Sequence, residues 1–265
     1  MKNNLLRAAA FIVVILAALL VFYFYTHKNT SSSSVDFKSP EADAAQAQGD
    51  LLKARSIYEK ALTDSKNDNS LQQIYDKIYD LNIKILFSSV LTADSQLYEI
   101  TPGDSLEKIA KKFNTTTELI KKANSLTRDV IVPGRKLKVQ KSTFSIVVDK
   151  SQNILTLLSD GTVFKVYNVS TGKGNCTPVG TFKIVNKLID PPWYSAKGVI
   201  PPDSPENVLG TRWMGIDNPG YGIHGTIDPA SIGFQCTEGC VRMRNAEVEE
   251  LYAIVPAGTE VTITD

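Results

Sequence analysis

Residues 144–172 read "FSIVVDKSQNILTLLSDGTVFKVYNVSTG", and their pattern decides the fold of the C-terminal half of the chain. Short runs rich in β-branched residues alternate with the turn signals "DKSQN" and "SDG", which is typical of consecutive β-strands. Asp160-Gly161 predicts a tight hairpin. Helical periodicity is absent from Thr143 onward, and proline- and glycine-rich connections separate the later strands. We therefore expect residues 143–265 to form a compact, mostly-β domain with long loops that carry function.

Residues 97–139, "LYEITPGDSLEKIAKKFNTTTELIKKANSLTRDVIVPGRKLKV", have a different pattern. A short strand precedes the turn "PGD", and Asp104 or Ser105 can cap a first helix. A second helix is capped at Thr115 or Thr116, and "VPGRKLKV" closes the segment with a turn and a strand. The pattern predicts a β–α–α–β unit over residues 96–141.

Residues 41–92 have helical periodicity, with a break at Gly49-Asp50 and a strongly amphipathic helix from Leu71 to Leu86. The first part resembles one tetratricopeptide-type helical hairpin. One such repeat rarely buries its apolar face alone, so we expect the hairpin to dock on the third helix or on a protein partner. A helical spacer and a protein-binding segment both remain open.

The stretch Ala8–Tyr25 contains no charged residue and ends in four aromatic residues. Its length and its aromatic end favour an uncleaved transmembrane signal anchor over residues 1–28, followed by a polar linker over residues 29–40. Basic residues precede the stretch, which places the N-terminus in the cytoplasm. The rest of the chain is then expected outside the cell membrane, in the periplasm or on the cell-wall side. A signal peptide cut within Ser31–Ser34 is the alternative.

The net charge of +1 gives no global basic field, so we expect no nucleic-acid binding. The chain has two histidines and three cysteines, and "HGTIDPASIGFQCTEGC", residues 224–240, holds one of the histidines and two of the cysteines. A Cys₃His zinc cage of His224, Cys176, Cys236 and Cys240 is one alternative, although the spacing is not the usual pair of zinc knuckles. A disulfide beside an unrelated histidine is a second alternative.

The third alternative, a cysteine nucleophile with its base, is the one that these residues favour. A thiol needs a neighbouring base to become a nucleophile. His224 is the histidine that a folded domain can offer Cys240, because His27 adjoins the expected anchor. Gly239 could expose amide groups that bind an oxyanion. Such a site requires neither a cofactor nor a metal ion.

Three motifs, "STGKGNCTPVGTFKI", "YGIHGT" and "TEGCVRM", resemble the L,D-transpeptidase (YkuD-like) catalytic domain over roughly residues 144–264. The family's signature is a histidine-glycine pair and then Ser-x-Gly-Cys-Ile/Val-Arg. It corresponds here to His224-Gly225 and to Thr237–Arg242. Thr237 replaces the common serine and keeps its hydroxyl. Glu238 departs from the usual polar residue and brings a negative charge near the thiol, which tends to raise the pKa of Cys240.

The resemblance implies that Cys240 attacks the carbonyl between residues three and four of a peptidoglycan stem peptide, with His224 as base and then acid. An amine from a second stem would resolve the thioester as a 3→3 cross-link. Water would instead make the enzyme an L,D-carboxypeptidase, and attachment of a wall protein is a further alternative. Arg242 would position a substrate carboxylate or brace its loop. The implied substrate-binding residues are Arg242, Tyr221, Gly225, Thr237 and Trp213.

Residues 97–139 resemble the LysM module, which implies binding of N-acetylglucosamine glycans, chiefly peptidoglycan. The implied groove lies between the "PGD" turn and the loop before the last strand. Its candidate residues are Gly103, Asp104, Ser105, Val130 and Ile131. If Cys240 stays a free thiol, Cys176 and Cys236 remain as a possible disulfide pair.

The expected fold class is therefore multidomain α+β. The expected parts are an N-terminal transmembrane helix, a short tetratricopeptide-like helical segment, a βααβ LysM module and a mostly-β L,D-transpeptidase catalytic domain. The expected partners are peptidoglycan stem peptides and glycan strands, the membrane, and a protein bound through the helical segment if that segment is not a plain spacer. A non-catalytic LysM cell-wall scaffold is the alternative from another class.

Overall fold

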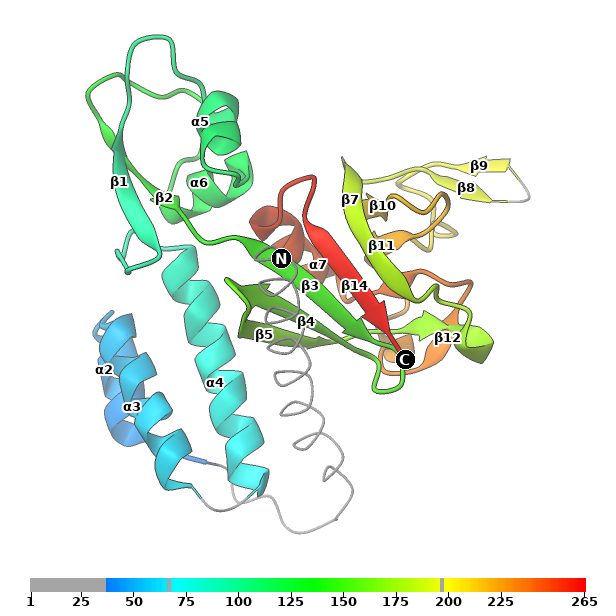
Figure 1. Ribbon diagram of the computed structural model, residues 1–265, viewed down its shortest axis with the longest axis horizontal. Coiled ribbons are helices and arrows are strands. Elements are labelled where there is room, and N and C mark those ends of the chain that lie inside the picture. The colour runs from blue at the N-terminus through cyan, green and yellow to red at the C-terminus, as the bar shows by residue number, and fades with distance from the viewer. Residues whose placement is uncertain (1–36, 66–67, 196–197) are drawn as a thin grey trace, which may run out of the picture. The chain divides into compact units, whose positions relative to one another are not determined.

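The computed structural model describes residues 37–65, 68–195 and 198–265 (Figure 1). The anchor expected over Ala8–Tyr25 lies outside these residues, and so does most of the linker. Within the described ranges, no helix is long and apolar enough to span a membrane. The described part of the chain divides into two compact units, residues 37–90 with Gly161–Lys165 and residues 91–160 with Val166–Asp265.

Three helices form the first unit: α2 (Pro40–Ala47), α3 (Leu51–Asp64) and α4 (Asp68–Leu86). The expected break between the first two is present, because Gly49 has a φ of 80° and Asp50 Oδ1 accepts the Lys53 amide at 3.1 Å. Helix α3 packs on both α2 and α4. Their shared core buries Ala42, Ala45, Ala54, Tyr58, Ile74, Ile78 and Leu81. The hairpin therefore does dock on the third helix, while binding of a protein partner stays a prediction.

The second unit begins with β1 (Ser95–Glu99), α5 (Leu106–Lys112), α6 (Thr117–Ala123) and β2 (Lys136–Gln140). Strands β1 and β2 pair antiparallel. Ser105 caps α5 and Thr116 caps α6, each by accepting a backbone amide in the first turn. The β–α–α–β order predicted from the sequence is confirmed.

An eight-stranded sheet follows, in the order β13-β11-β10-β7-β14-β3-β4-β5. Its strands are β3 (Phe144–Asp149), β4 (Ile154–Ser159), β5 (Thr162–Asn168), β7 (Gly180–Ile189), β10 (Arg212–Ile216), β11 (Gly222–His224), β13 (Val241–Arg242) and β14 (Glu260–Thr264). Strand β14 lies between β3, to which it is parallel, and β7, to which it is antiparallel (Figure 1). The last strand of the sequence thus joins the two halves of the sheet.

Two short strand pairs and two 3₁₀ turns lie in the connections between the strands of this sheet. Strand β6 (Thr171–Gly172) pairs with β12 (Gln235–Thr237), and β8 (Trp193–Ser195) pairs with β9 (Gly198–Ile200). The 3₁₀ turns η1 (Lys173–Asn175) and η2 (Pro229–Ser231) lie in the long connections. The mostly-β architecture with long loops agrees with the expectation from the sequence.

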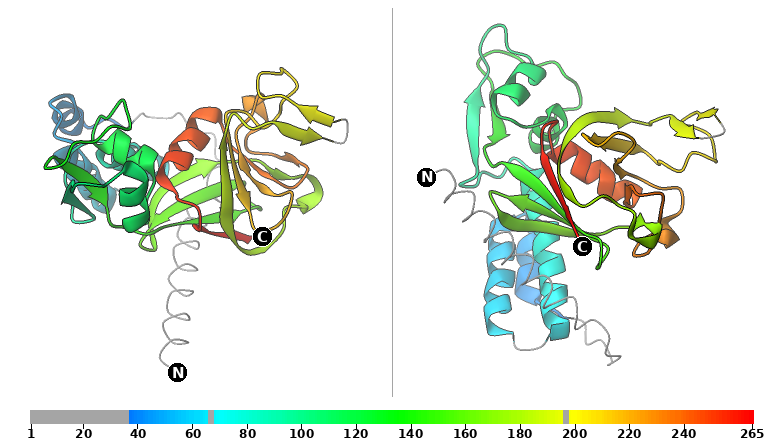
Figure 2. Two further views of the ribbon diagram at one scale, coloured as in Figure 1. Left: turned by 90° about the horizontal axis from the view of Figure 1, so that it is seen from above. Right: turned by 45° about the vertical axis from the view of Figure 1, so that its right-hand side comes forward.

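The expectation of no helical pattern after Thr143 is wrong, because α7 (Asn245–Ile254) lies in this region. Its last turns bury the consecutive residues 251–254 as well as Val248. The helix contacts β10, β11 and α6, and the left view of Figure 2 shows it as the orange-red helix between the green helices and the sheet. A short helix that is covered on several sides needs no single apolar stripe, so its sequence has a weak helical period.

The α6–α7 contact joins the two predicted modules of the second unit. The Thr116 hydroxyl, which caps α6, donates to the carbonyl of Ala253. Lys187 on β7 donates to the carbonyls of Tyr252 at 2.6 Å and Val255 at 2.8 Å, at the end of α7. Burial lowers the pKa of Lys187 to about 8, and the Glu118 carboxylate on α6 opposes that shift. The β–α–α–β unit is therefore packed against the sheet domain rather than only tethered to it.

Candidate active site

The pairing of β11 with β13 brings the two predicted catalytic residues onto one face of the sheet. The strands run parallel, with His224 opposite Arg242 and Ile223 opposite Val241. Cys240 directly precedes β13. Because side chains alternate along a strand, Cys240 lies on the same face as Arg242 and His224. The next position of the register places Gly222, which has no side chain, beside Cys240.

A tight turn holds the backbone of Cys240. The buried Thr237 hydroxyl donates to the Cys240 carbonyl at 2.7 Å and accepts the Gly239 amide at 3.2 Å. Gly239 has a φ of 122°, and a Cβ at this position would stand 2.6 Å from the Tyr221 ring. Only glycine fits both the φ and the space. The Gly239 amide, expected to bind an oxyanion, is thus engaged within the turn.

The Cys240 thiol is half-buried. It donates to the Gly220 carbonyl at a distance of 3.6 Å. Burial raises the pKa of Cys240, the Gly222 amide opposes this shift, and the Glu238 carboxylate adds to it. A resting cysteine in this setting is a neutral thiol, so it needs a base to become a nucleophile.

His224 is 3% exposed, and its burial lowers the pKa of the imidazole to about 4. The ring is therefore neutral at neutral pH and can accept a proton. Its Nδ1 lies 2.7 Å from the carbonyl oxygen of Gly225. A proton on Nδ1 satisfies that carbonyl and leaves the other nitrogen as the acceptor. The structure has no hydrogen bond between the His224 ring and the Cys240 thiol. The separation between a base and its nucleophile often shortens to hydrogen-bonding distance only when substrate binds.

Trp213 covers the imidazole. The indole and the His224 ring are stacked with centroids 5.9 Å apart and an interplanar angle of 21°. Asn186 on β7 fixes the indole, because its Oδ1 accepts Trp213 Nε1 at 3.0 Å and the Gly215 amide at 3.1 Å. Trp213 thus limits the motion of the His224 ring, and the indole also lines the adjacent cavity.

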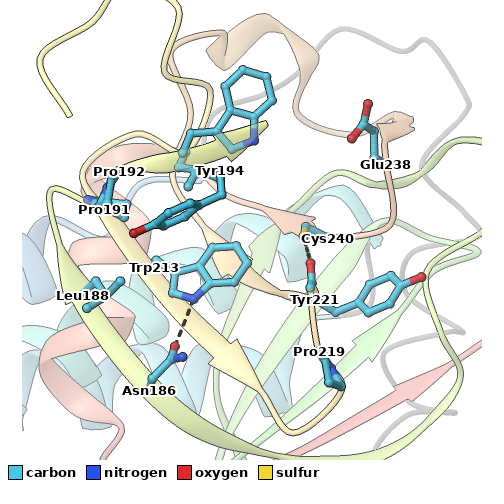
Figure 3. A pocket seen from close by; sticks show the side chains of 13 residues that line it. Asn186, Leu188, Pro191, Pro192, Tyr194, Trp213, Pro219, Tyr221, Glu238 and Cys240 are labelled. Carbon is cyan, nitrogen blue, oxygen red and sulfur yellow. Dashed lines mark hydrogen bonds between the residues drawn. The ribbon is translucent and has the colours of Figure 1, made fainter. Parts of the chain in front are cut away.

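A cavity of about 590 Å³ opens beside the thiol (Figure 3). Aromatic and proline side chains form much of its wall, Cys240 lies at one edge, and the Glu238 carboxylate lies at the rim. The lining residues are Asn186, Leu188, Pro191, Pro192, Trp193, Tyr194, Leu209, Trp213, Pro219, Gly220, Tyr221, Glu238 and Cys240. A concave wall that combines apolar side chains with several polar groups is typical of a site that binds an organic ligand. Of the predicted substrate-binding residues, Trp213 and Tyr221 line this cavity.

Arg242, Gly225 and Thr237 do not line the cavity. Arg242 Nη1 donates to Ser231 Oγ at 3.0 Å and lies 3.9 Å from Cys236 Sγ, so the guanidinium braces the loop before Cys240. Gly225 presents its carbonyl to His224, and Thr237 builds the turn. All three residues lie close to Cys240 or His224 in the chain or the sheet, and direct contact of any of them with substrate stays a prediction.

The three cysteines carry free thiols in the structure. The Cys176–Cys236 bridge is therefore absent here and stays a prediction for the oxidised protein. Cys176 packs near the catalytic turn, because a Cβ placed on Gly172 would meet Cys176 Sγ at 2.5 Å and Gly239 Cα at 3.0 Å. Among the described residues, no group of three or more His, Cys, Asp or Glu side chains could hold a metal ion. The zinc-cage alternative has no support.

The predicted glycan-binding residues have mixed surroundings. Asp104 Oδ2 accepts the Tyr98 hydroxyl at 2.9 Å and the Thr101 amide at 2.8 Å, so this carboxylate stabilises its own turn. Ser105 is the α5 cap, Gly103 has a φ of 90°, and Ile131 packs on the core of the unit. Val130 is 77% exposed and is the candidate most open to a ligand.

Comparisons with known proteins agree with these features. The model of the YkuD family, "L,D-transpeptidase catalytic domain", matches residues 143–263, and the LysM domain model matches residues 98–140. The chain is 34% identical over 177 residues to a putative L,D-transpeptidase, YkuD of Bacillus licheniformis, covering 63% of this chain and 98% of that protein. It is 43% identical over 126 residues to the putative L,D-transpeptidase YqjB of Bacillus subtilis, covering 45% and 70%.

A solved L,D-transpeptidase from Mycobacterium smegmatis also matches, with a TM-score of 0.40, 23% identity, and coverage of 51% of this chain and 65% of that one. The family models and the near-complete match to a sequence relative carry the assignment. The chain belongs to the L,D-transpeptidase family and combines a YkuD-type catalytic domain with a LysM domain.

Proposed function

We propose that the chain is a peptidoglycan L,D-transpeptidase in which Cys240 is the nucleophile and His224 the base. One observation supports this most strongly. A thiol at the edge of an aromatic cavity shares a sheet face with a neutral, buried imidazole. A neutral imidazole can take the thiol proton, and the imidazolium that forms can return it to a leaving amine.

The first half-reaction is acylation. As Cys240 Sγ attacks the carbonyl of stem residue three, its proton moves to His224. The amide bond to residue four breaks, and the departing amine of D-alanine takes that proton from the imidazolium. Because Thr237 engages the Gly239 amide, we place the oxyanion against the amide of Cys240 itself.

The second half-reaction releases the enzyme. The neutral side-chain amine of residue three in a second stem attacks the thioester and gives up a proton to His224, and the thiol is restored. The product is a 3→3 cross-link. Bulk water reaching the thioester would give the carboxypeptidase product instead.

The LysM domain supplies the wall contact in this proposal, through the region that includes Gly103, Ser105 and Val130. The anchor over residues 1–28 would hold the enzyme at the membrane, and the helical segment over residues 41–92 would act as a spacer. Binding to the glycan raises the local concentration of stems at the active site without new contacts there.

The decisive experiment incubates the protein with soluble tetrapeptide muropeptides and identifies products by mass. We expect an acyl-enzyme on Cys240, release of D-alanine and 3→3 dimers. The Cys240→Ala variant should lose turnover by several orders of magnitude yet still bind wall sacculi, because the nucleophile is removed and the LysM domain is not. Cys236→Ala is the matched control and should stay active. Product formation by Cys240→Ala at the native rate contradicts the proposal.

A further inference from the structure

One side chain outside the predicted motifs holds the backbone around His224. Asn245 is the first residue of α7. Its Oδ1 accepts the Thr226 amide at 3.0 Å and the Thr211 amide at 3.3 Å. Thr226 follows β11, which ends at His224, and Thr211 precedes β10, which pairs with β11. Asn245 therefore ties together the two chain segments that flank His224.

The Thr226 amide and the Gly225 carbonyl belong to the same peptide group. A trans peptide is planar, and its N–H and C=O point in opposite directions. The N–H end is fixed on Asn245, and the C=O end lies 2.7 Å from His224 Nδ1. Holding one end of this rigid unit therefore aims the other. Hydrogen bonds in series also polarise one another, so the carbonyl becomes a better acceptor.

The Thr211 contact lies near a second backbone carbonyl that interacts with the imidazole. The Leu209 carbonyl, two residues before Thr211, also interacts with the His224 ring and favours its protonated form. Two glycines make room for the carboxamide. A Cβ on Gly210 or on Gly225 would stand 2.2 Å from Asn245 Oδ1. The Asn245 side chain therefore lies very close to the backbone at both Gly210 and Gly225.

We propose that Asn245 is a positioning residue for the catalytic base and acts on His224 through the Gly225–Thr226 peptide. It keeps the proton of the neutral ring on Nδ1, so that the other nitrogen stays free to take the Cys240 proton. It does not line the cavity and so acts without touching the substrate. This inference rests on the proposed function, which assigns His224 as the base.

The charged and titratable groups around His224 determine how an added charge would change the pKa of its ring. The Arg242 guanidinium approaches from β13 and lowers the pKa of the ring, and the Cys240 thiol precedes that strand. Trp213 from β10 and Asn245 from α7 carry no charge. A carboxylate at position 245 would keep both hydrogen bonds and add one negative charge, which would favour the imidazolium.

The test measures two rates in the full chain as a function of pH. The first is alkylation of Cys240 by iodoacetamide, resolved by peptide mass, and the second is acylation by a tetrapeptide muropeptide. In Asn245→Ala we expect both rates at neutral pH to fall about 10- to 100-fold with little change in KM, because the base is misplaced rather than the substrate. Asn245→Asp should restore both rates and move the acid limb of the profile to higher pH.

Asn124 provides the matched control, because it bridges backbone groups in the LysM domain in the same way. Its Oδ1 accepts the Lys138 amide at 2.7 Å, and its Nδ2 donates to the Ile120 carbonyl at 2.8 Å. Asn124→Ala should lower the melting temperature and leave both rates unchanged. Gly225→Ala should behave like Asn245→Ala, because its methyl group displaces the carboxamide, and the double variant should not lose the sum of the two effects.

The proposal is overturned if Asn245→Ala keeps both native rates, or if Asn124→Ala loses as much. Should Asn245→Ala fail to fold, Asn245→Asp decides, since an unshifted acid limb is also a negative result. Alkylation needs no muropeptide. A wild-type chain that is never acylated would therefore refute the proposed function while the role of Asn245 is still measured.

Discussion

At the scale of single residues, the neutral state of the buried His224 makes the stability of the fold depend on pH. Burial lowers its pKa from 6.5 to about 4, so between these values the unfolded chain binds a proton that the folded chain does not. The free energy of unfolding should therefore be highest above pH 6.5 and fall as the pH drops toward 4, by up to about 3 kcal/mol from this group. Below pH 4 the contribution is constant.

Urea unfolding at pH 7, 5.5 and 4.5 checks this expectation against His224→Gln, in which this part of the slope should vanish. Equal slopes for the two proteins would show that His224 is protonated in the folded state as readily as in the unfolded one.

The sequence predicted the catalytic pair but not what supports it. Cys240 and His224 stand out because few residue types can supply a nucleophile and a base. Thr237 was expected to bind substrate, which stays a prediction, and the role of its hydroxyl in the turn was not foreseen. Asn186 and Asn245 were missed because each bridges groups that are distant in the sequence, and such bonds have no periodic pattern. The one sequence signal was the excess of glycine around His224. Glycines indicate that another group packs closely against the backbone, but they do not identify that group.

At the scale of elements, one buried cation fixes two loops that lie close to Cys240 in the fold. Lys150 follows β3, and its ammonium donates to the Asn175 carbonyl at 3.3 Å and the Thr177 carbonyl at 3.0 Å, beside an ion pair with Asp265 at 2.9 Å. The Gln235 side chain donates to the carbonyl of Lys150 at 3.3 Å. This residue thus connects the Cys176 loop with β12, which leads into the catalytic turn.

Lys150→Met should lower the free energy of unfolding by about 2 kcal/mol, since two carbonyls lose a charged donor, and should also slow acylation. The measurements are urea unfolding and the muropeptide assay. Lys173→Met, on the same loop but exposed, is the control and should match wild type in both. A Lys150→Met protein as stable and active as the control would contradict this account.

Element types were easier to predict than their neighbours. Alternation and turn residues gave the strands, and the cap residues gave the β–α–α–β unit, because both are local properties of the chain. Helix α7 was missed since its burial comes from α6 and the sheet together. The pairing of β14 between β3 and β7 has no sequence signal either, because it depends on contacts between the ends of the domain.

At the scale of the whole molecule, the LysM and catalytic domains share a packed contact at α6 and α7. Deleting residues 97–139 would expose the end of α7, so a point change tests glycan binding more cleanly. Val130→Asp should weaken pelleting with wall sacculi, because it puts a charge on the candidate groove, and should leave acylation of a small muropeptide unchanged.

Val179 is the matched control, since it is 56% exposed on the catalytic domain. Val179→Asp should pellet like wild type. Equal pelleting of all three proteins would remove Val130 from the glycan-binding surface.

The direct connection between β2 and β3 has a mechanical consequence. Only residues 141–143 separate the last LysM strand from β3, and β3 is an inner strand, hydrogen-bonded to β14 on one side and to β4 on the other. If the LysM domain holds one wall strand while Cys240 carries the stem of another, tension between the two would pull along β3 and load both ladders in shear, so that their bonds must fail together rather than one at a time. An enzyme joined to its polymer in this way can stay folded and in place while the wall around it stretches.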